Sequence, residues 1–210
     1  HPSLNGVKNK LIGQKLTHVE TYGKAFVLCF NNDVRIYVHL QLFGKWKTGP
    51  LSNPPNTTRV LRFTLETESH FIRLYSATSI QALLPAEIKN HPFIRKLGPD
   101  ILNQGDDDKD KRMKQISEER FSRRRLGALL LDQSFFAGIG NYLRSEILFF
   151  AYLHPEKQLK DSTPSQREAL ADAIHKLVIR AYHTGGITTP DGHVEKSKLR
   201  GEKYESYRHY

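Results

Sequence analysis

Cysteine is nearly absent from this sequence: Cys29 is the only one among 210 residues. A single cysteine excludes an internal disulfide and a zinc site made of cysteines, so we predict no metal site in this chain. Long apolar runs are missing too, which excludes a membrane span, and no basic-then-apolar leader suggests secretion. We therefore expect an intracellular protein, and its 38% hydrophobic residues suffice for a globular core.

Acidic residues are in the minority. The chain has 32 Lys and Arg against 22 Asp and Glu, a net charge of +10. This balance favours a polyanionic partner. Many soluble proteins are simply basic, however, so the motifs have to decide whether that partner is a nucleic acid.

The first part of the chain has the alternation of strands. From Leu16 to about Ala77, apolar and polar residues alternate, with many β-branched and aromatic residues. Asn31 to Asp33 separates two of the predicted strands, and Gly49 to Asn56 is a longer predicted loop. Because sheets with one apolar face pack on each other, we predict an antiparallel β-sandwich.

After Pro85 the spacing becomes helical. Thr163, Pro164 and Gln166 form a capping box with proline in the first turn, and Gly185-Gly186 ends the helix that follows. The predicted helices are Lys111 to Ser117, Leu126 to Phe136, Asn141 to Ala151 and Ser165 to His183.

A stretch without periodicity divides these two halves. It is rich in Gly and Asp, and we place a linker there, at residues 98–110. The predicted fold class is α+β, with a β-sandwich domain at residues 1–97 and a helical domain at residues 111–210.

Gly138-Ile139-Gly140-Asn141 interrupts an apolar helical pattern. A helix start has unpaired N–H groups and partial positive charge, and glycines let a phosphate approach them closely. Asn141 would add a side-chain donor. A tight turn between two helices explains the same glycines on steric grounds, so this pattern alone leaves both readings open.

The surrounding residues, "LLLDQSFFAGIGNYLRSEILF", resemble the helix-two-turn-helix signature of the formamidopyrimidine-DNA glycosylase and endonuclease VIII family. "THVETYGKAFVLCF", "VHLQLFGKW", "TTRVLRFTL", "HPFIRKLGPD" and "TTPDGHVEKSKLRG" are similar to endonuclease VIII segments, in the same order. The resemblance implies a β-sandwich joined by a hinge to a helix-two-turn-helix domain, with no membrane association. It also implies base excision repair: a monomer in the cytoplasm, at the nucleoid, that removes oxidised bases, mainly pyrimidines, from double-stranded DNA and cleaves abasic sites.

The resemblance assigns roles to several residues. Gln41, Leu42 and Phe43 match the wedge that fills the space of an extruded base. The pattern alone would instead make Leu42 and Phe43 core residues at a strand end. Lys24 matches a lysine that contacts the DNA backbone and assists elimination, although by itself it reads as surface charge.

Phosphate contacts are implied at Gly138, Gly140 and Asn141, and at Lys96 or its neighbour Arg95, where the family usually has arginine. Arg120 and the run Arg123 to Arg125 could follow the DNA backbone or form a solvated face. Glu146 is predicted to tie helix to helix or linker, and His154 to be a turn residue.

The family's nucleophile is an N-terminal proline amine, which forms a Schiff base and leads to β,δ-elimination. Here Pro2 follows His1, so its nitrogen is an amide. The family's zinc finger needs four cysteines, which this chain lacks. We therefore expect a chain truncated at both ends, without zinc or other cofactor, and inactive by itself. One alternative is a nucleic-acid-binding module without catalysis, and another is the same enzyme acting on oxidised purines.

Overall fold

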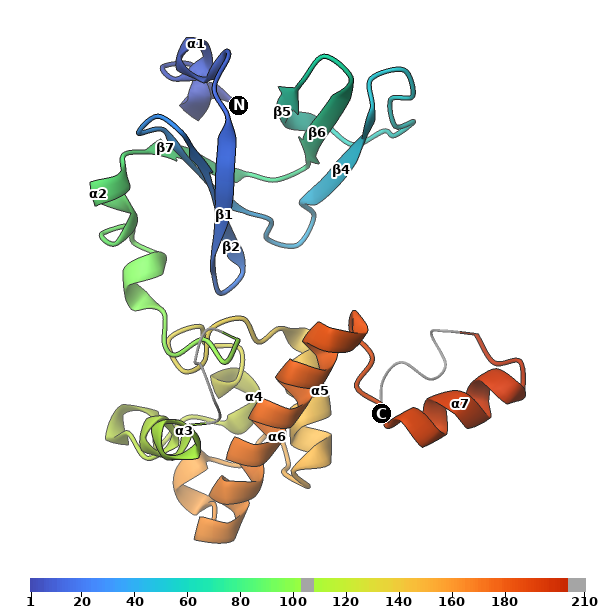
Figure 1. The fold of residues 1–210 in the computed structure, drawn as a ribbon. Helices are drawn as coiled ribbons and strands as arrows, with labels where there is room; N and C mark the ends of the chain where they lie inside the picture. The colour runs from blue at the N-terminus through green and yellow to red at the C-terminus, as the bar shows by residue number, and fades with distance from the viewer. Residues whose placement is uncertain (103–107, 204–210) are drawn as a thin grey trace. The chain divides into compact units, whose positions relative to one another are not determined.

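The computed structural model describes residues 1–102 and 108–203. They form two compact units, His1–Arg95 and Lys96–Tyr210. Of the predicted linker, residues 98–102 and 108–110 therefore lie in the second unit, and residues 103–107 lie outside the described residues. Each unit has its own hydrophobic core. Figure 1 labels strands of the first unit and helices of the second.

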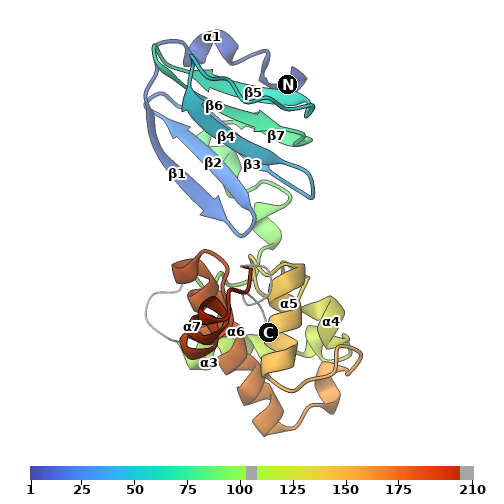
Figure 2. The ribbon, with the colours of Figure 1, turned by 90° about the vertical axis from the view of Figure 1, so that its right-hand side faces the viewer.

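The first unit contains two antiparallel sheets (Figure 2). In the first sheet the order is β1 (Leu16–Tyr22), β2 (Ala25–Phe30), β3 (Arg35–His39) and β7 (Ser79–Leu83). In the second the order is β4 (Lys45–Pro50), β6 (His70–Tyr75) and β5 (Leu61–Glu66). The short helices of this unit are η1 (Pro2–Leu4), α1 (Lys8–Leu11), α2 (Pro85–Ile88) and η2, whose range Ile94–Lys96 crosses into the second unit.

Strand β2 is apolar throughout because both of its faces are covered. Leu28 packs with Phe63 and Leu74 of the second sheet, whereas Val27 on the opposite face packs with Ile88 of α2. The predicted sandwich is therefore confirmed. The loop predicted at residues 49–56 starts later, because the pairing of β4 with β6 continues through Pro50.

The second unit is helical. Its elements are α3 (Lys109–Ile116), η3 (Glu119–Phe121), α4 (Leu126–Leu129), α5 (Asn141–Phe150), η4 (Leu159–Asp161), α6 (Pro164–Thr184) and α7 (Asp191–Leu199). The capping box of Thr163 and Gln166 is present, and Gly185 ends α6 in the left-handed conformation, as predicted. Helices α5 and α6 share the core of this unit.

One predicted helix is much shorter than expected. The helix predicted at Leu126 to Phe136 ends at Leu129. The Asp132 carboxylate accepts hydrogen bonds from the N–H and the hydroxyl of Ser134, at 2.9 and 2.7 Å. Such local side-chain bonds compete with helix continuation. The prediction also missed α7, which buries only Val194 and Ser197 and therefore has no apolar stripe. Among the described residues, no helix combines the length and apolarity that crossing a bilayer requires.

Candidate functional site

The β3–β4 loop, residues 40–44, presents large apolar side chains to solvent. Leu42 is 83% exposed and Phe43 is 70% exposed, and Gln41 is exposed as well. These side chains are therefore not core residues at a strand end, as the alternation alone had favoured. Two adjacent apolar side chains in water are typical of a surface that inserts into or binds a partner.

The backbone of this loop is tightly fixed. The Gly44 N–H donates to the Leu40 carbonyl at 2.8 Å, and a Cβ on Gly44 would lie 2.5 Å from that oxygen. The Arg59 guanidinium, from the segment before β5, donates to the Phe43 carbonyl at 2.7 Å. The two apolar side chains therefore project from a closed, braced turn.

Gln41 has an unusual backbone conformation, with φ at +53°. Its N–H donates to Nδ1 of His39 at 3.0 Å, and the Thr78 hydroxyl donates to its side-chain oxygen at 2.5 Å. Non-glycine residues with positive φ are strained and persist where their surroundings fix them, often at functional sites. The neighbours of Gln41 provide that fixation.

Lys24 lies close to the start of the same loop, where β3 ends. It sits in the turn between β1 and β2, and the next residue, Ala25, pairs with His39 at the end of β3. Burial lowers the pKa of the half-buried Lys24 ammonium. Burial also lowers the pKa of His39, and the charge of Lys24 lowers it further. The structure thus brings the predicted lysine beside the predicted wedge residues.

A pocket of about 340 Å³ opens beside the loop, and the sequence analysis missed one of its lining residues, His91. His91 is 7% exposed and stacks on Tyr37, with ring centroids 4.1 Å apart. Its Nδ1 accepts the Phe93 N–H at 3.3 Å, and burial lowers its pKa. The lining residues are Tyr37, His39, Gln41, Ser79, Gln81, His91, Pro92 and Phe93. The only sequence signal was the "HPF" motif, which drew attention to the basic residues after it.

The second group of predicted residues forms the glycine turn, Gly138–Asn141. Gly138 has a φ of +92°, which favours glycine, and Gly140 is the N-cap of α5 without a side-chain cap. Asn141 is exposed at the first position of the helix. The N-terminus of α5 therefore combines the helix dipole with uncapped backbone N–H groups, as an anion site requires.

Gln133, which the sequence analysis overlooked, holds this turn, and Gln115, also overlooked, holds the segment just before it. Oε1 of Gln133 accepts the Gly138 N–H at 3.0 Å, and its Nε2 donates to the Ile139 carbonyl at 3.1 Å. Nε2 of Gln115, from α3, donates to the Phe135 carbonyl at 2.8 Å. Because the Gly138 N–H is bonded internally, Gly138 shapes the turn and leaves anion binding to the amides of α5.

The basic residues differ in how free they are. The side chains of Arg95 and Lys96 are exposed and form no ion pair with another described residue. In the second basic group, Arg120 and Arg123 to Arg125, the side chain of Arg123 is also exposed, whereas the other three arginines form ion pairs with carboxylates. These pairs are Arg120 with Glu118 at 2.5 Å, Arg124 with Asp132 at 3.0 Å and Arg125 with Glu156 at 2.5 Å.

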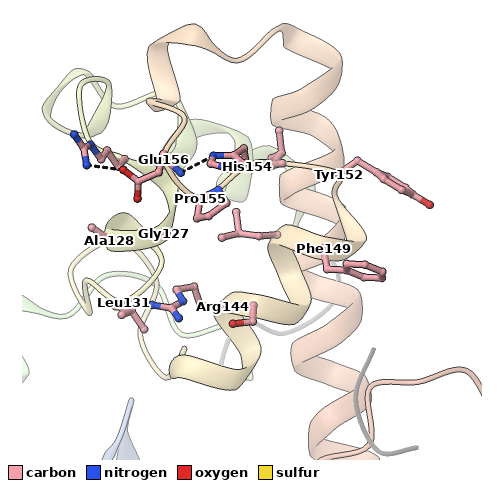
Figure 3. Close-up of a pocket in the computed structure, with 13 residues that line it drawn as sticks. Gly127, Ala128, Leu131, Arg144, Phe149, Tyr152, His154, Pro155 and Glu156 are labelled. Carbon is pink, nitrogen blue, oxygen red and sulfur yellow. Dashed lines mark hydrogen bonds and ion pairs between the residues drawn. The ribbon is translucent and has the colours of Figure 1, made fainter.

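The last of these pairs borders a surface groove of about 940 Å³ between α4 and α5 (Figure 3). His154 is one of its lining residues, and its Nδ1 accepts the Glu156 N–H at 3.2 Å, which confirms the prediction that His154 is a turn residue.

Glu146 is buried and accepts a hydrogen bond from the buried Thr188 hydroxyl at 2.6 Å, which ties α5 to the segment before α7. Its predicted structural role is also confirmed.

Each of the two units matches a domain model of one known protein family. Residues 1–76 match the family model of the formamidopyrimidine-DNA glycosylase N-terminal domain, and residues 97–192 match that of the formamidopyrimidine-DNA glycosylase H2TH domain. The chain belongs to this glycosylase family. Within it, Endonuclease 8 of Escherichia coli is 42% identical over 192 residues, which cover 91% of this chain and 73% of the relative. Endonuclease 8 of Shigella sonnei is 41% identical over the same shares of the two chains.

Solved structures show the same fold. The Fpg of Lactococcus lactis in complex with DNA containing an abasic site has a TM-score of 0.74 at 23% identity, covering 88% of this chain and 68% of that one. The same protein with an oxidised pyrimidine in the DNA has a TM-score of 0.74 at 23% identity, covering 86% and 67%. The chain thus spans about two thirds of these structures. A four-cysteine finger does not fit the residues present, since Cys29 is the single cysteine.

Proposed function

We propose that the protein acts in base excision repair, removing oxidised bases, mainly pyrimidines, from double-stranded DNA and cleaving the resulting abasic site. The observation that carries this proposal is the β3–β4 loop, with Leu42 and Phe43 exposed by 83% and 70% beside the half-buried Lys24. A glycosylase has to extrude its target base from the duplex, and apolar side chains can occupy the vacated stack. Gln41 would meet the unpaired base opposite.

The glycine turn would hold the DNA backbone. The uncapped N-terminus of α5 and the Asn141 side chain offer donors to a phosphate, and Arg95 and Lys96 add charge that no described carboxylate neutralises. Phosphate contacts of this kind fix register without reading sequence. A lesion-seeking enzyme needs that property, because damage occurs in every sequence context.

Lys24 would assist the chemistry. Its lowered pKa brings the amine closer to exchanging protons at neutral pH than an exposed lysine would be. In the proposed reaction a secondary amine attacks C1′ of the sugar, and the base leaves with the electron pair of its bond to C1′. The amine then loses its proton, and its electron pair forms a C=N bond as the C1′–O4′ bond breaks and O4′ takes up a proton, which gives a ring-opened iminium. Successive β- and δ-eliminations then release the two phosphates.

The attacking amine is assigned to an N-terminal proline. The Pro2 nitrogen is acylated by His1, and its lone pair is delocalised into that amide, so we give Pro2 no role. We propose that the 210-residue chain binds damaged DNA but forms no Schiff base. A monomer would suffice for this reaction, which takes place where genomic DNA is found.

Borohydride trapping tests the enzyme proposal. The complete product of the gene should form a covalent adduct with duplexes containing an abasic site or thymine glycol, and less with oxidised guanine, whereas the 210-residue chain should form none. Absence of an adduct with the complete product would leave only the non-catalytic binding module. Adduct formation by the 210-residue chain would show that another amine is the nucleophile.

The role of the loop is tested by Leu42→Ala with Phe43→Ala in the complete product. We expect cleavage of thymine glycol duplexes to fall at least about 10-fold, with an unchanged free energy of unfolding because both side chains are exposed. Ile12→Ala is the matched control, since Ile12 is 72% exposed but lies outside the loop. Equal activity in the double variant and the control would refute the wedge.

A further inference from the structure

A group of potential metal ligands lies on the edge of the first sheet, outside the proposed DNA-binding residues. His18 of β1 pairs directly with Cys29 of β2, and Glu20 is two residues further along β1. Because alternate residues of a strand share a face, all three side chains lie on one side of the sheet. One ligand atom from each lies within 4.8 Å of the other two.

Neighbouring side chains orient two of these ligands. Nδ1 of His18 lies 3.0 Å from the Thr17 hydroxyl, and Oε2 of Glu20 accepts the Tyr22 hydroxyl at 2.8 Å. These contacts turn the remaining atoms, Nε2 of His18 and Oε1 of Glu20, toward each other at 3.3 Å. Outer hydrogen bonds that fix the free edge of an imidazole or a carboxylate are typical of protein metal sites.

We propose that His18, Glu20 and Cys29 form a binding site for a borderline-soft divalent metal ion, with Zn²⁺ as the best fit and water as the fourth ligand. In a tetrahedral zinc site, ligand atoms lie about 3.3–3.8 Å apart. The histidine and glutamate atoms already meet this spacing, and because the Cys29 Sγ lies within 4.8 Å of both, binding requires it to shift by at most about 1 Å. A thiolate beside an imidazole selects against Mg²⁺ and Ca²⁺.

Access and charge are compatible with an ion. The side chains of His18 and Glu20 are 57% and 37% exposed, so an ion can enter from solvent although Cys29 is buried. Binding would transfer the Cys29 thiol proton to water, leaving a thiolate and a carboxylate that neutralise the divalent ion.

The charged neighbour of the group is Arg35, whose field reaches both Glu20 and Cys29. Its Nη1 donates to the carbonyls of Phe30, Asn32 and Val34 at 3.1, 2.8 and 3.0 Å, so the guanidinium is held by the β2–β3 turn. A bound ion would join the edge strand β1 to β2, in the hairpin that carries Lys24. This site is separate from a four-cysteine finger and does not depend on the proposed DNA chemistry.

Cobalt substitution tests the site in the 210-residue chain. Since Cys29 is its single cysteine, thiolate-to-cobalt charge-transfer absorption in the near ultraviolet reports on this residue alone. We expect this absorption to saturate at one Co²⁺ per chain and to disappear when Zn²⁺ displaces it. Saturating Co²⁺ without charge-transfer absorption would overturn the proposal.

Three variants locate the ligands by competition between Zn²⁺ and Co²⁺. His18→Ala should weaken binding about 100-fold or more and Glu20→Gln about 10-fold, while Cys29→Ser should remove the charge-transfer absorption. His193→Ala, an exposed histidine of α7, should leave affinity unchanged. Because His18 is exposed, its replacement should not unfold the chain. Unchanged Zn²⁺ affinity in His18→Ala would therefore overturn the proposal even if Cys29→Ser fails to fold.

Discussion

The β3–β4 loop and the glycine turn are built in opposite ways. The loop places two apolar side chains in water, and its backbone is braced by Arg59 through the Phe43 carbonyl. The glycine turn has few side-chain atoms, and the side-chain amide of Gln133, in the same unit, holds its backbone. A wedge has to present side chains, whereas a phosphate clamp has to present amides. The comparison therefore ties each construction to its proposed task.

The largest expected effects come from glycines whose missing Cβ lets two backbones meet. A Cβ on Gly98 would overlap the carbonyl oxygens of Ser134 and Phe135, and a Cβ on Gly44 would lie 2.5 Å from the Leu40 carbonyl oxygen. Gly98→Ala and Gly44→Ala should each lower the free energy of unfolding by about 2–3 kcal/mol, because backbone cannot move aside as a side chain can. Urea unfolding measures this.

Gly6→Ala is the control for both variants, since a Cβ there meets nothing within 4 Å. Each clash should perturb its own unit: Gly44→Ala the sandwich and Gly98→Ala the helical unit. If either variant matched Gly6→Ala in its urea midpoint, the close approach at that position would be wrong.

The next largest effect separates Gln133, beside the glycine turn, from Gln41 of the β3–β4 loop, because their replacement should change the free energy of unfolding by different amounts. Gln133→Ala removes the acceptor of the Gly138 N–H and the donor to Ile139, and should lower stability by about 2 kcal/mol. Gln41→Ala removes one exposed bond, from Thr78, and should change stability by less than about 0.5 kcal/mol. Affinity for a duplex with an abasic-site analogue should fall in both variants. Equal stability losses would contradict the contrast between a scaffolded turn and a surface loop.

Local signals explain what the sequence predicted well. The capping box and terminal glycine of α6 act on adjacent residues, and the apolar run of β2 reflects burial on both of its faces. Helix α7 was missed because a helix that buries two residues has no periodic pattern. The prediction at 126–136 ran too long because Asp132 looks like any polar helix residue until its bond to Ser134 is seen.

The site residues were harder to derive than the fold. Leu42 and Phe43 read as core by pattern, and only the resemblance to a family indicated that they are exposed. Gln133 bonds to the backbone of the glycine turn, and because every residue has the same backbone groups, the sequence does not indicate such a bond. His18 and Cys29 meet through a register that contains an irregularity after Leu16, so their distance in sequence gave no hint of contact.

A smaller effect is expected where only conformation, and not space, requires glycine. Gly138 has a φ of +92° but nothing within 4 Å of a Cβ, so Gly138→Ala should cost about 1 kcal/mol from backbone strain alone. Gly192→Ala is the matched control, because that glycine lies within α7, has equal space and should gain helix propensity. If Gly138→Ala were as stable as wild type, the left-handed conformation of the turn would be wrong.

The smallest effect is a pH dependence between pH 7 and pH 5, which we expect in the first unit. Burial lowers the pKa of His91, and a proton on its Nδ1 would also break the bond from the Phe93 N–H. Below about pH 6.5 the unfolded chain therefore binds a proton that the folded chain does not, so stability falls as the pH falls. His39, whose pKa is lowered by burial and by the charge of Lys24, adds to this trend.

The glycine turn should not share this trend, because the amides of Gln115 and Gln133 do not titrate. Hydrogen exchange between pH 7 and pH 5, corrected for intrinsic rates, should show protection falling at the Phe93 amide and holding at the Gly138 amide. In His91→Gln, the urea midpoint of the first unit should change less steeply with pH than in the wild type. Some slope should remain, because His39 still titrates. His183→Gln, at an exposed position in α6, should leave that slope unchanged. An equal loss of protection at both amides would mean that lowering the pH destabilises both units alike. It would contradict the proposal that the histidines whose protonation opposes folding lie in the first unit.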